Sequence, residues 1–433
     1  MRRFFFYTIY QPFSQFIHSV YRACERANYI YSMKIQKQFT AIITCLCLCF
    51  TAKAQQKSFS YDDYFYYRNH QYLQTPSVLL NGAVLKAATG DTTAAIALVK
   101  QAAAKNMYDT GYISGRSGIS FITKTEHWAA IKNVIATNRH FYSAPANMQI
   151  VTSDIDRFWQ LYDRIKDEKA DELFLKNYII DGSQGLRTFF EVRMGLRASN
   201  LLTTVWGKNK YYESIKQVSL SLKHYKPQIL TAAKKLKILY DDAIFPPTSF
   251  VLGNFNAFGT ADGGGGQLIG VEFLCNKATA DTSQLGDWEK SNLTDTSKIL
   301  GIVLHELIHI EQNTAATNTL LSKSINEGAA DFVSQLVLGY NLNAKIHEYG
   351  NAHEKELWEK FRKQMDGDDV SEWLYNGFDA KRGYPQDLGY YMGYKICEAY
   401  YNKAADKKKA VKDILEIQDF KSFFQQSGYE TKV

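Results

Sequence analysis

The chain has 433 residues, of which 45% are hydrophobic, so it has enough apolar material for packed cores and is not expected to be disordered. Its formal net charge of +7 raises the question of a nucleic-acid or membrane partner. The first 54 residues hold seven basic residues and one acid, whereas the other 379 hold 44 basic and 43 acidic residues. The excess positive charge therefore belongs to the N-terminal segment, and the body of the chain is not expected to bind nucleic acid.

The N-terminal segment, 1–54, has the features of a leader with an export signal. Two lysines precede an apolar run, and small residues follow at the −3 and −1 positions of a cleavage site. This pattern predicts a signal peptide over 33–54, cleavage after Ala54, and export to the bacterial periplasm or the medium. The apolar run is shorter than the roughly 20 residues of a membrane span, so no stable span is expected after cleavage. A permanent anchor and a lipid-modified Cys45 are the alternatives.

Residues 55–145 are expected to form a helical accessory region. Small and apolar residues recur at helical spacing on both sides of a turn, in which Gly90 ends one helix and Asp91 starts the next. This predicts a helical hairpin, which resembles a tetratricopeptide-like repeat unit. Stable repeat arrays need about three units, and only one is visible, so a generic pair of helices is the alternative.

The remaining residues, 146–433, predict a mainly α-helical α+β domain. Apolar residues at three- and four-residue spacing indicate helices in 146–243, and the segments "TSFVLG" and "QLIGVEFL" indicate strands within 248–275. The glycine-rich segment between these strands lacks the lysine of a phosphate-binding loop, so we interpret it as a flexible loop. Helices are expected to return over 297–313, 324–339, 352–364 and 387–404, the last two among the C-terminal helices of 341–433.

The segment "HELIHIEQ" contains two histidines four residues apart. On a helix, His305 and His309 share one face, so their rings can bind a single metal ion. Glu306 reaches the same side from a different angle, where it can take a proton from an activated water. A buried helix whose histidines bond backbone carbonyls is the alternative for this motif alone.

The segment "SINEGAAD" supplies what a catalytic zinc needs beyond two histidines. Such a zinc takes three protein ligands and keeps a fourth position open. Glu327 can complete a His₂Glu set, and Asp331, one turn later, can accept the second ring N–H of a ligand histidine and fix its tautomer. Two zinc-site helices are therefore expected within 296–340. The same letters also fit a helix start with Ser324 as N-cap and Glu327 closing a capping box.

The HExxH motif followed by Asn-Glu-x-x-x-Asp resembles the gluzincins, the thermolysin-like zinc peptidases. Over about 150–433, the phrases "FWQLYD", "LHELIHIEQ", "NEGAADFV" and "LGYYMGYKI" are more closely similar to an uncharacterised bacterial family of predicted zinc-dependent proteases. The resemblance implies a Zn²⁺ cofactor and peptide-bond hydrolysis. It implies that zinc is bound by His305, His309 and Glu327, that Asp331 orients a ligand, and that Glu306 is the general base.

The resemblance also implies a zincin-like catalytic domain at 146–433, behind the helical accessory region. An edge strand of its small sheet could hold an extended peptide or protein substrate by backbone hydrogen bonds. The implied function is that of an exported zinc metallopeptidase. A non-catalytic zinc-binding protein, acting as a binding module at the cell envelope, is the alternative. Because Glu306 is present as well as the three ligands, we favour catalysis.

Thermolysin-like enzymes stabilise the oxyanion with a histidine or tyrosine from the C-terminal region, and no residue here matches that pattern. We expect this donor among Tyr390, Tyr391 and Tyr394 of "LGYYMGYKI", with Tyr394 preferred. Packing in the core is the alternative role for each tyrosine. His347 and His353 are further candidates.

Two cysteines, Cys275 and Cys397, remain once the leader is removed. In an oxidising compartment they could form a disulfide that closes a loop of about 120 residues. Two buried free thiols are the alternative, and no cysteine pattern indicates a metal site.

Overall fold

A computed structural model describes residues 70–431, except 263, 265 and 377–382. These residues belong to one unit, which extends from Ser60 to Val433. The predicted leader, 1–54, lies outside the described residues, so the signal peptide and export remain predictions. No helix within the described residues is both long and apolar enough to cross a membrane.

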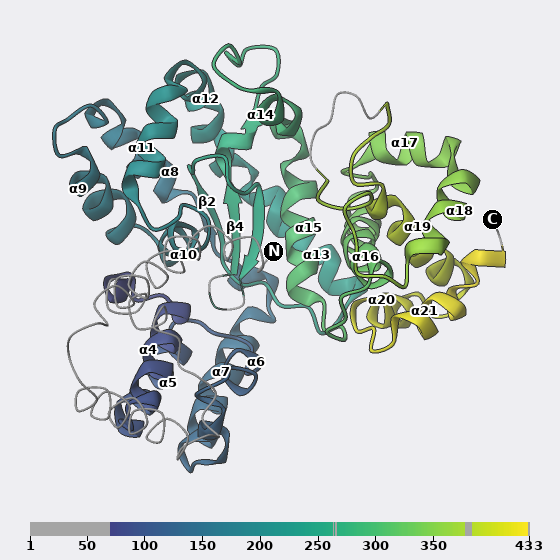
Figure 1. Cartoon of the computed structure of the whole chain (residues 1–433), viewed down its shortest axis with the longest axis horizontal. Helices are drawn as coiled ribbons and strands as arrows, with labels where there is room; N and C mark the ends of the chain where they lie inside the picture. Colours follow the sequence, from purple (N-terminus) through teal and green to yellow (C-terminus); the bar gives the residue numbers. More distant parts are fainter. Residues whose placement is uncertain (1–69, 263, 265, 377–382, 432–433) are drawn as a thin grey trace, which may run out of the picture. The chain divides into compact units, whose positions relative to one another are not determined.

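Helices make up most of the described chain, together with a small sheet (Figure 1), which confirms the prediction of a mainly helical α+β fold. The helices before the sheet are α4 (Pro76–Ala88), α5 (Thr92–Ala103), α6 (Gly111–Ser114), α7 (His127–Tyr142), α8 (Ser153–Leu161), α9 (Ala170–Phe174), α10 (Gln184–Val192), α11 (Ala198–Gly207), α12 (Asn209–Ser221) and α13 (Lys226–Leu239). The later helices are α14 (Asp287–Asn292), α15 (Ile299–Glu311), α16 (Leu320–Leu338), α17 (Ala344–Ala352), α18 (Glu354–Gln364), α19 (Leu388–Lys403), α20 (Lys407–Leu415) and α21 (Phe420–Ser427).

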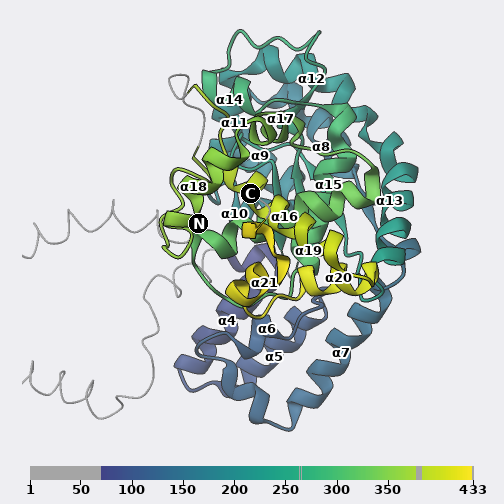
Figure 2. The same ribbon diagram turned by 90° about the vertical axis from the view of Figure 1, so that its right-hand side faces the viewer.

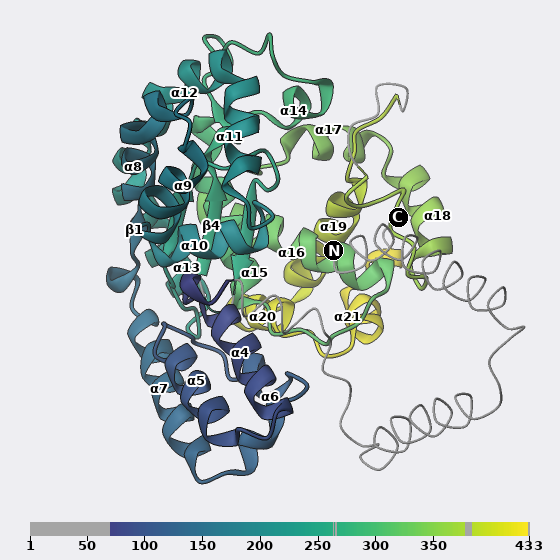
Figure 3. The ribbon, with the colours of Figure 1, turned by 60° about the vertical axis from the view of Figure 1, so that its left-hand side comes forward.

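The predicted helical hairpin is formed by α4 and α5, which pack against each other (Figure 3). Gly90 lies between them in the left-handed region, with φ of +84°, and the Asp91 side chain caps α5 by accepting a hydrogen bond from Ala94 N at 3.0 Å. Helix α7 packs against α5, and buried side chains of these helices form a separate apolar cluster. The structure thus shows the hairpin, and the likeness to a tetratricopeptide unit remains a prediction.

The main sheet has four strands in the order β1-β2-β4-β3: β1 (Ile150–Val151), β2 (Thr248–Val251), β4 (Gly266–Gly270) and β3 (Gly259–Asp262). β2 pairs in parallel with both β1 and β4, and β3 pairs antiparallel to β4. Every residue of β2 and β4 is buried, as expected of central strands covered on both faces. A second, two-stranded sheet joins β5 (Leu274–Cys275) and β6 (Thr294–Asp295).

One strand prediction was wrong. The segment "GTAD", which was interpreted as part of a flexible loop, forms the edge strand β3. Glycine and aspartate disfavour strands when considered alone, but β4 offers its free edge as a partner, and this tertiary pairing outweighs the local preference.

A buried carboxylate holds the loop that leads from β2 to β3. Glu272 is fully buried, and its two oxygens accept hydrogen bonds from Gly253 N and Phe255 N, each at 2.9 Å. Burial raises the pKa of Glu272 from 4.5 to about 7, against the effect of these backbone donors. Tyr212 also donates to the carbonyl of Gly253 at 2.8 Å. The approach to the edge strand is therefore fixed from the protein interior.

Helix α15 lies against β3 and β4, and α10 against β2 and β4. Figures 1 and 3 show the strands between α15 and the helices α8–α12. Nine of the 13 residues of α15 are buried and none is exposed, which fits its apolar sequence "ILGIVLHELIHIE". The helix that carries the HExxH motif is thus a core element that joins the sheet to the C-terminal helices.

Helix α16 packs against α15 and, most extensively, against α19 (Figure 2). The two helices approach closely through glycines: a Cβ at Gly328 would overlap the backbone nitrogen of Tyr394, and one at Gly393 would overlap the carbonyl of Ser324. α16 begins at Leu320, where the Thr319 side chain accepts from Ser322 N at 3.2 Å. The capping-box interpretation was therefore wrong, because Ser324 lies inside the helix and not at its start.

The two cysteines of this part of the chain, Cys275 and Cys397, are both buried and unpaired.

Candidate metal centre

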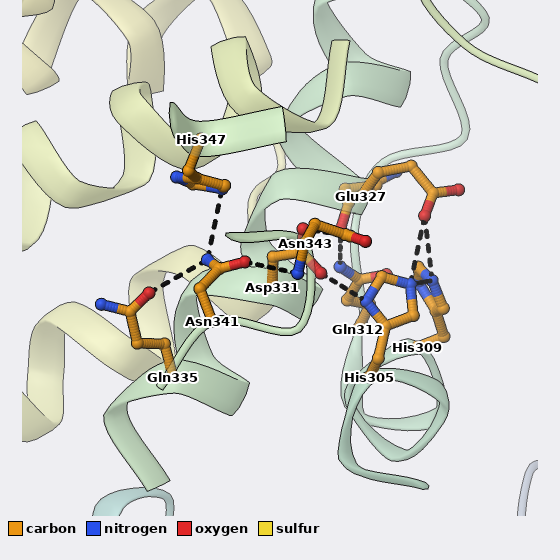
Figure 4. Close-up of polar contacts among 10 residues, drawn as sticks. His305, His309, Gln312, Glu327, Asp331, Gln335, Asn341, Asn343 and His347 are labelled. Carbon is orange, nitrogen blue, oxygen red and sulfur yellow. Dashed lines mark hydrogen bonds and ion pairs between the residues drawn. The ribbon is translucent and has the colours of Figure 1, made fainter. Parts of the chain in front are cut away.

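Three side chains from α15 and α16 meet at one point (Figure 4). His305 Nε2 and His309 Nε2 are 3.1 Å apart, and Glu327 Oε2 lies 3.4 Å from the first and 3.2 Å from the second. His305 and Glu327 are each only 8% exposed. The structure thus brings together all three residues that were predicted to bind the metal.

The spacing of these atoms fits a tetrahedral zinc ion. Ligand atoms about 2.0–2.1 Å from a tetrahedral ion lie about 3.3 Å from one another, close to the three observed distances. Glu327 Oε2 is also a buried oxygen without a hydrogen-bond partner in the described structure. A buried carboxylate oxygen needs compensation, and a cation between the three ligand atoms would supply it. The donor set therefore fits Zn²⁺.

Asp331 orients the first histidine from the side away from the metal position. Its Oδ1 lies 2.9 Å from His305 Nδ1, and because a carboxylate can only accept, Nδ1 carries a proton; in the neutral imidazole that binds a metal, the lone pair is then on Nε2. The second oxygen of Asp331 accepts a hydrogen bond from Asn343 Nδ2 at 2.8 Å. The geometry is that of the orienting role expected for Asp331, with Asn343 as a support that the sequence did not indicate.

Gln312 plays the corresponding part for the second histidine, and it was missed at the level of sequence. Its Oε1 lies 2.9 Å from His309 Nδ1, while its Nε2 donates to the Asn326 carbonyl at 2.6 Å (Figure 4). Gln312 follows α15 directly, three residues after His309. That spacing was the available signal, but whether the side chain turns back to the ring depends on the position of α16.

The charges of the three ligands are strongly coupled. Burial lowers the pKa of His305, but the neighbouring carboxylates of Asp331 and Glu327 outweigh this and raise it well above its usual range. For Glu327, burial raises the pKa, but His309 and His305 outweigh that effect and hold it well below its usual range. A cation that binds here therefore displaces a proton from an imidazole.

Glu306 follows His305 on α15, and its carboxylate lies against the edge strand β3. A Cβ at Gly259 of β3 would overlap Glu306 Oε1, so the absence of a side chain at Gly259 lets the carboxylate rest against the strand backbone. Burial raises the pKa of Glu306, and the charges of His309, His305 and Arg193 oppose that shift. Arg193 in turn donates from Nε to Thr260 Oγ1 of the same strand at 2.8 Å.

Two tyrosines contact the ligands. The hydroxyl of Tyr375 donates to Glu327 Oε1 at 2.5 Å, and the ring of Tyr390 stacks on His305 with 5.9 Å between centroids and 17° between planes. Tyr375 has a left-handed backbone, with φ of +55°, which is strained for a residue with a side chain. The hydroxyl of Tyr390 makes no hydrogen bond with a described residue, and nearby Glu327 and Tyr375 add to the burial that raises its pKa. Tyr375 was not predicted.

The other predicted donors lie elsewhere. Tyr394 is 4% exposed, and its ring packs against His347, at 4.3 Å between centroids, and against Phe332. The Tyr391 hydroxyl donates to Asn351 at 3.1 Å. His353 stacks on Tyr349. Of the candidates named from the sequence, Tyr390 is the one that the structure places against a metal ligand.

Comparison with known proteins matches part of the chain to a protein family. A family model described as "Predicted Zn-dependent protease (DUF2268)" matches residues 288–419, which include α15, α16 and α19. The matched part is under a third of the chain and narrower than the 150–433 over which the resemblance was expected. It contains the three predicted ligands, and it supports the class of predicted zinc-dependent protease. No curated protein and no solved structure matches the chain.

Proposed function

We propose that this protein is a zinc-dependent peptidase of the gluzincin type, which hydrolyses peptide bonds with Glu306 as general base. The observation that carries the proposal is the buried Glu327 Oε2, which faces the Nε2 atoms of His305 and His309 and has no hydrogen-bond partner in the described structure. A structural zinc site would use four ligands rich in cysteine, whereas three ligands of this kind leave a position for substrate and water. The matched family supports the same class.

The chemistry divides between the metal and Glu306. Zinc, when bound, polarises the carbonyl of the peptide bond and lowers the pKa of a water beside it. Glu306 accepts the proton of that water on its carboxylate and then delivers it to the nitrogen of the leaving amine. Burial, which raises the pKa of Glu306, moves it towards the range in which a carboxyl group can both accept and return a proton near neutral pH.

The edge strand β3 is suited to hold the substrate. Its inner edge pairs with β4, and no strand among the described residues pairs with its outer edge. An extended peptide can add to such an edge through backbone hydrogen bonds. Because Glu306 rests against Gly259 of this strand, a peptide bound there would pass beside the general base.

Tyr390 is the donor that we assign to the oxyanion. Its ring is held parallel to that of His305, and its hydroxyl has no partner among the described residues. Tyr375 instead donates to Glu327 Oε1, which leaves Oε2 turned towards the histidines. In this assignment Tyr390 acts on the substrate and Tyr375 orients a ligand.

Substitution of the general base tests the proposal. Glu306→Gln keeps the size of the side chain but removes its ability to accept a proton. We expect the variant to bind zinc as the wild type does and to lose cleavage of a broad peptide library, while Glu348→Gln, at an exposed site on α17, cleaves normally. A wild type that binds no zinc, or a Glu306→Gln variant that cleaves as well as the wild type, would contradict the proposed function.

A further inference from the structure

The connection between α16 and α17 carries the residue that supports Asp331. It begins at Gly339, which ends α16 with φ of +80°, and it leads to Asn343, directly before α17. Asn343 Nδ2 donates to Asp331 Oδ2 at 2.8 Å, and the other oxygen of Asp331 lies 2.9 Å from His305 Nδ1. Whatever fixes Asn343 therefore acts on the orientation of the first metal ligand.

The side chain of Asn341 fixes Asn343 from within the same connection. Its Oδ1 accepts a hydrogen bond from the backbone N–H of Asn343 at 2.7 Å, in the i to i+2 pattern by which an asparagine closes a turn. Because a backbone N–H can only donate, this contact assigns the amide of Asn341: its oxygen faces Asn343, and its NH₂ group faces the other way. The position of Asn343 is thus set by a contact whose direction is known.

The NH₂ group of Asn341 contacts both neighbouring helices (Figure 4). Its Nδ2 donates to Gln335 Oε1 of α16 at 3.0 Å and lies 3.2 Å from His347 Nε2 of α17. Since the NH₂ group only donates, His347 Nε2 is the acceptor. The His347 ring is itself held, because it packs edge to face on Tyr394 with 4.3 Å between centroids. One amide therefore ties the end of α16 to the first turn of α17.

The same connection also rests on α15. Leu342, between the two asparagines, packs where Gly301 leaves room, since a Cβ at Gly301 would lie 3.0 Å from Leu342 Cδ1. Gly301 is one turn before His305 on α15. The connection thus contacts the helices that carry the metal ligands as well as α17.

We propose that Asn341 is a positioning residue of the metal centre. It holds Asn343, which holds Asp331, and Asp331 in turn orients the ring of His305. Asn341 therefore acts on a ligand through a chain of hydrogen bonds. The inference rests on the proposed function only in that His305 binds a metal ion, and it requires no cleavage.

The zinc affinity of the full chain tests the inference, by competition with a chromophoric chelator. Asn341→Ala removes the contact with Asn343, Asn341→Asp keeps an oxygen that can accept it, and Asn343→Ala removes the contact with Asp331. Asn276→Ala is the matched control, because Asn276 Oδ1 accepts from Ala278 N at 3.0 Å in the same i to i+2 pattern, in the chain that follows β5. Thermal unfolding of each metal-free variant shows whether it is folded.

We expect Asn341→Ala to lower zinc affinity at least about twofold, yet less than the roughly 10- to 100-fold typical of a direct partner of a ligand. Asn341→Asp should retain more of the affinity than Asn341→Ala, and Asn276→Ala should bind zinc as the wild type does. The double variant Asn341→Ala/Asn343→Ala should bind zinc as tightly as Asn343→Ala alone, because Asn341 acts through Asn343. If Asn341→Ala does not fold, Asn341→Gln takes its place, because the longer side chain keeps an amide but moves its oxygen away from the Asn343 N–H.

A folded Asn341→Ala variant that binds zinc as tightly as the wild type would overturn the inference. So would losses of affinity that add up in the double variant, since Asn341 would then act by a route other than Asn343. Equal affinities of Asn341→Asp and Asn341→Ala would do the same. These results leave zinc binding and cleavage by the wild type unchanged, whereas a failure of the proposed function appears in the wild type itself.

Discussion

Replacement of Asp331 by asparagine tests how much the orientation of His305 contributes to zinc binding, because His305 itself is left in place. The carboxylate is inaccessible to solvent and bonds His305 Nδ1 at 2.9 Å and Asn343 Nδ2 at 2.8 Å. Both partners donate, so both oxygens of Asp331 must accept. An asparagine keeps one acceptor and turns an NH₂ group towards the other donor, which leaves one of the two contacts broken.

The expected effect is a weaker zinc site. Loss of a partner behind a ligand histidine typically lowers metal affinity 10- to 100-fold, or about 1.4–2.7 kcal/mol. Gln312→Ala removes the matching contact at His309, where the partner is neutral and half-buried. Hydrogen bonds to charged groups are roughly twice as strong as neutral ones. Asp331→Asn should therefore weaken zinc binding more than Gln312→Ala does.

Competition with a chromophoric chelator measures both zinc affinities. Ser334→Ala is the matched control, because Ser334 is buried on the same helix and its hydroxyl has no partner in the described structure. Thermal unfolding of the metal-free variants separates a loss of affinity from a loss of fold. If Asp331→Asn bound zinc as tightly as the wild type, or if Gln312→Ala bound it more weakly than Asp331→Asn, the assignment of Asp331 would be wrong.

Three further predictions concern the donor, the metal and the fold. Tyr390→Phe should lower kcat by roughly 10²–10³-fold without loss of zinc, whereas Tyr394→Phe should leave kcat near that of the wild type. Equal effects of the two variants in steady-state assays would refute the assignment of Tyr390 as the oxyanion donor. Zinc affinity should rise by about tenfold per pH unit near neutrality for each proton displaced, because the pKa of His305 is raised in the protein without metal. Calorimetry in buffers of different ionisation enthalpy counts the protons released on zinc binding. A count of zero would disprove this coupling. The pKa of Glu272 is raised from 4.5 to about 7, so the folded protein holds more protons in that interval, and its unfolding free energy should fall by up to about 3 kcal/mol as the pH rises through it. Glu272→Gln should flatten that profile in denaturant titrations, and a profile identical to that of the wild type would rule the explanation out.

The parts of the site that were predicted are those that a helix encodes locally. His305 and His309 are one turn apart, as are Glu327 and Asp331, so the 3.6-residue period alone sets which side chains share a face. The pairing of the two helices could be inferred because zinc requires a third ligand. The helical content of the fold followed from the same periodicity.

The parts that were missed depend on tertiary position. Tyr375 reaches Glu327 from 48 residues away and from a strained backbone, and Asn343 reaches Asp331 from beyond the end of α16. No periodic pattern relates these pairs. β3 was missed for a similar reason, since its hydrogen bonds come from β4 and not from its own residue preferences. Tyr390 and Tyr394 lie one turn apart on α19. Which of them contacts His305 depends on how α19 packs against α16, and the sequence does not give that packing.

The glycine contact between α16 and α19 has a mechanical consequence. Because Gly328 and Gly393 bring the two backbones together, α16 and α19 form a closely packed pair that carries Glu327 and Tyr390. The two histidines and Glu306 lie on α15, which packs against the sheet and against α16. A metal ion bound by His305, His309 and Glu327 would link α15 to the pair α16 and α19, so a substitution that moves these helices apart would also move the three ligands apart. The amount of bound zinc would therefore report how closely α15 packs against α16, even for substitutions far from the ligands.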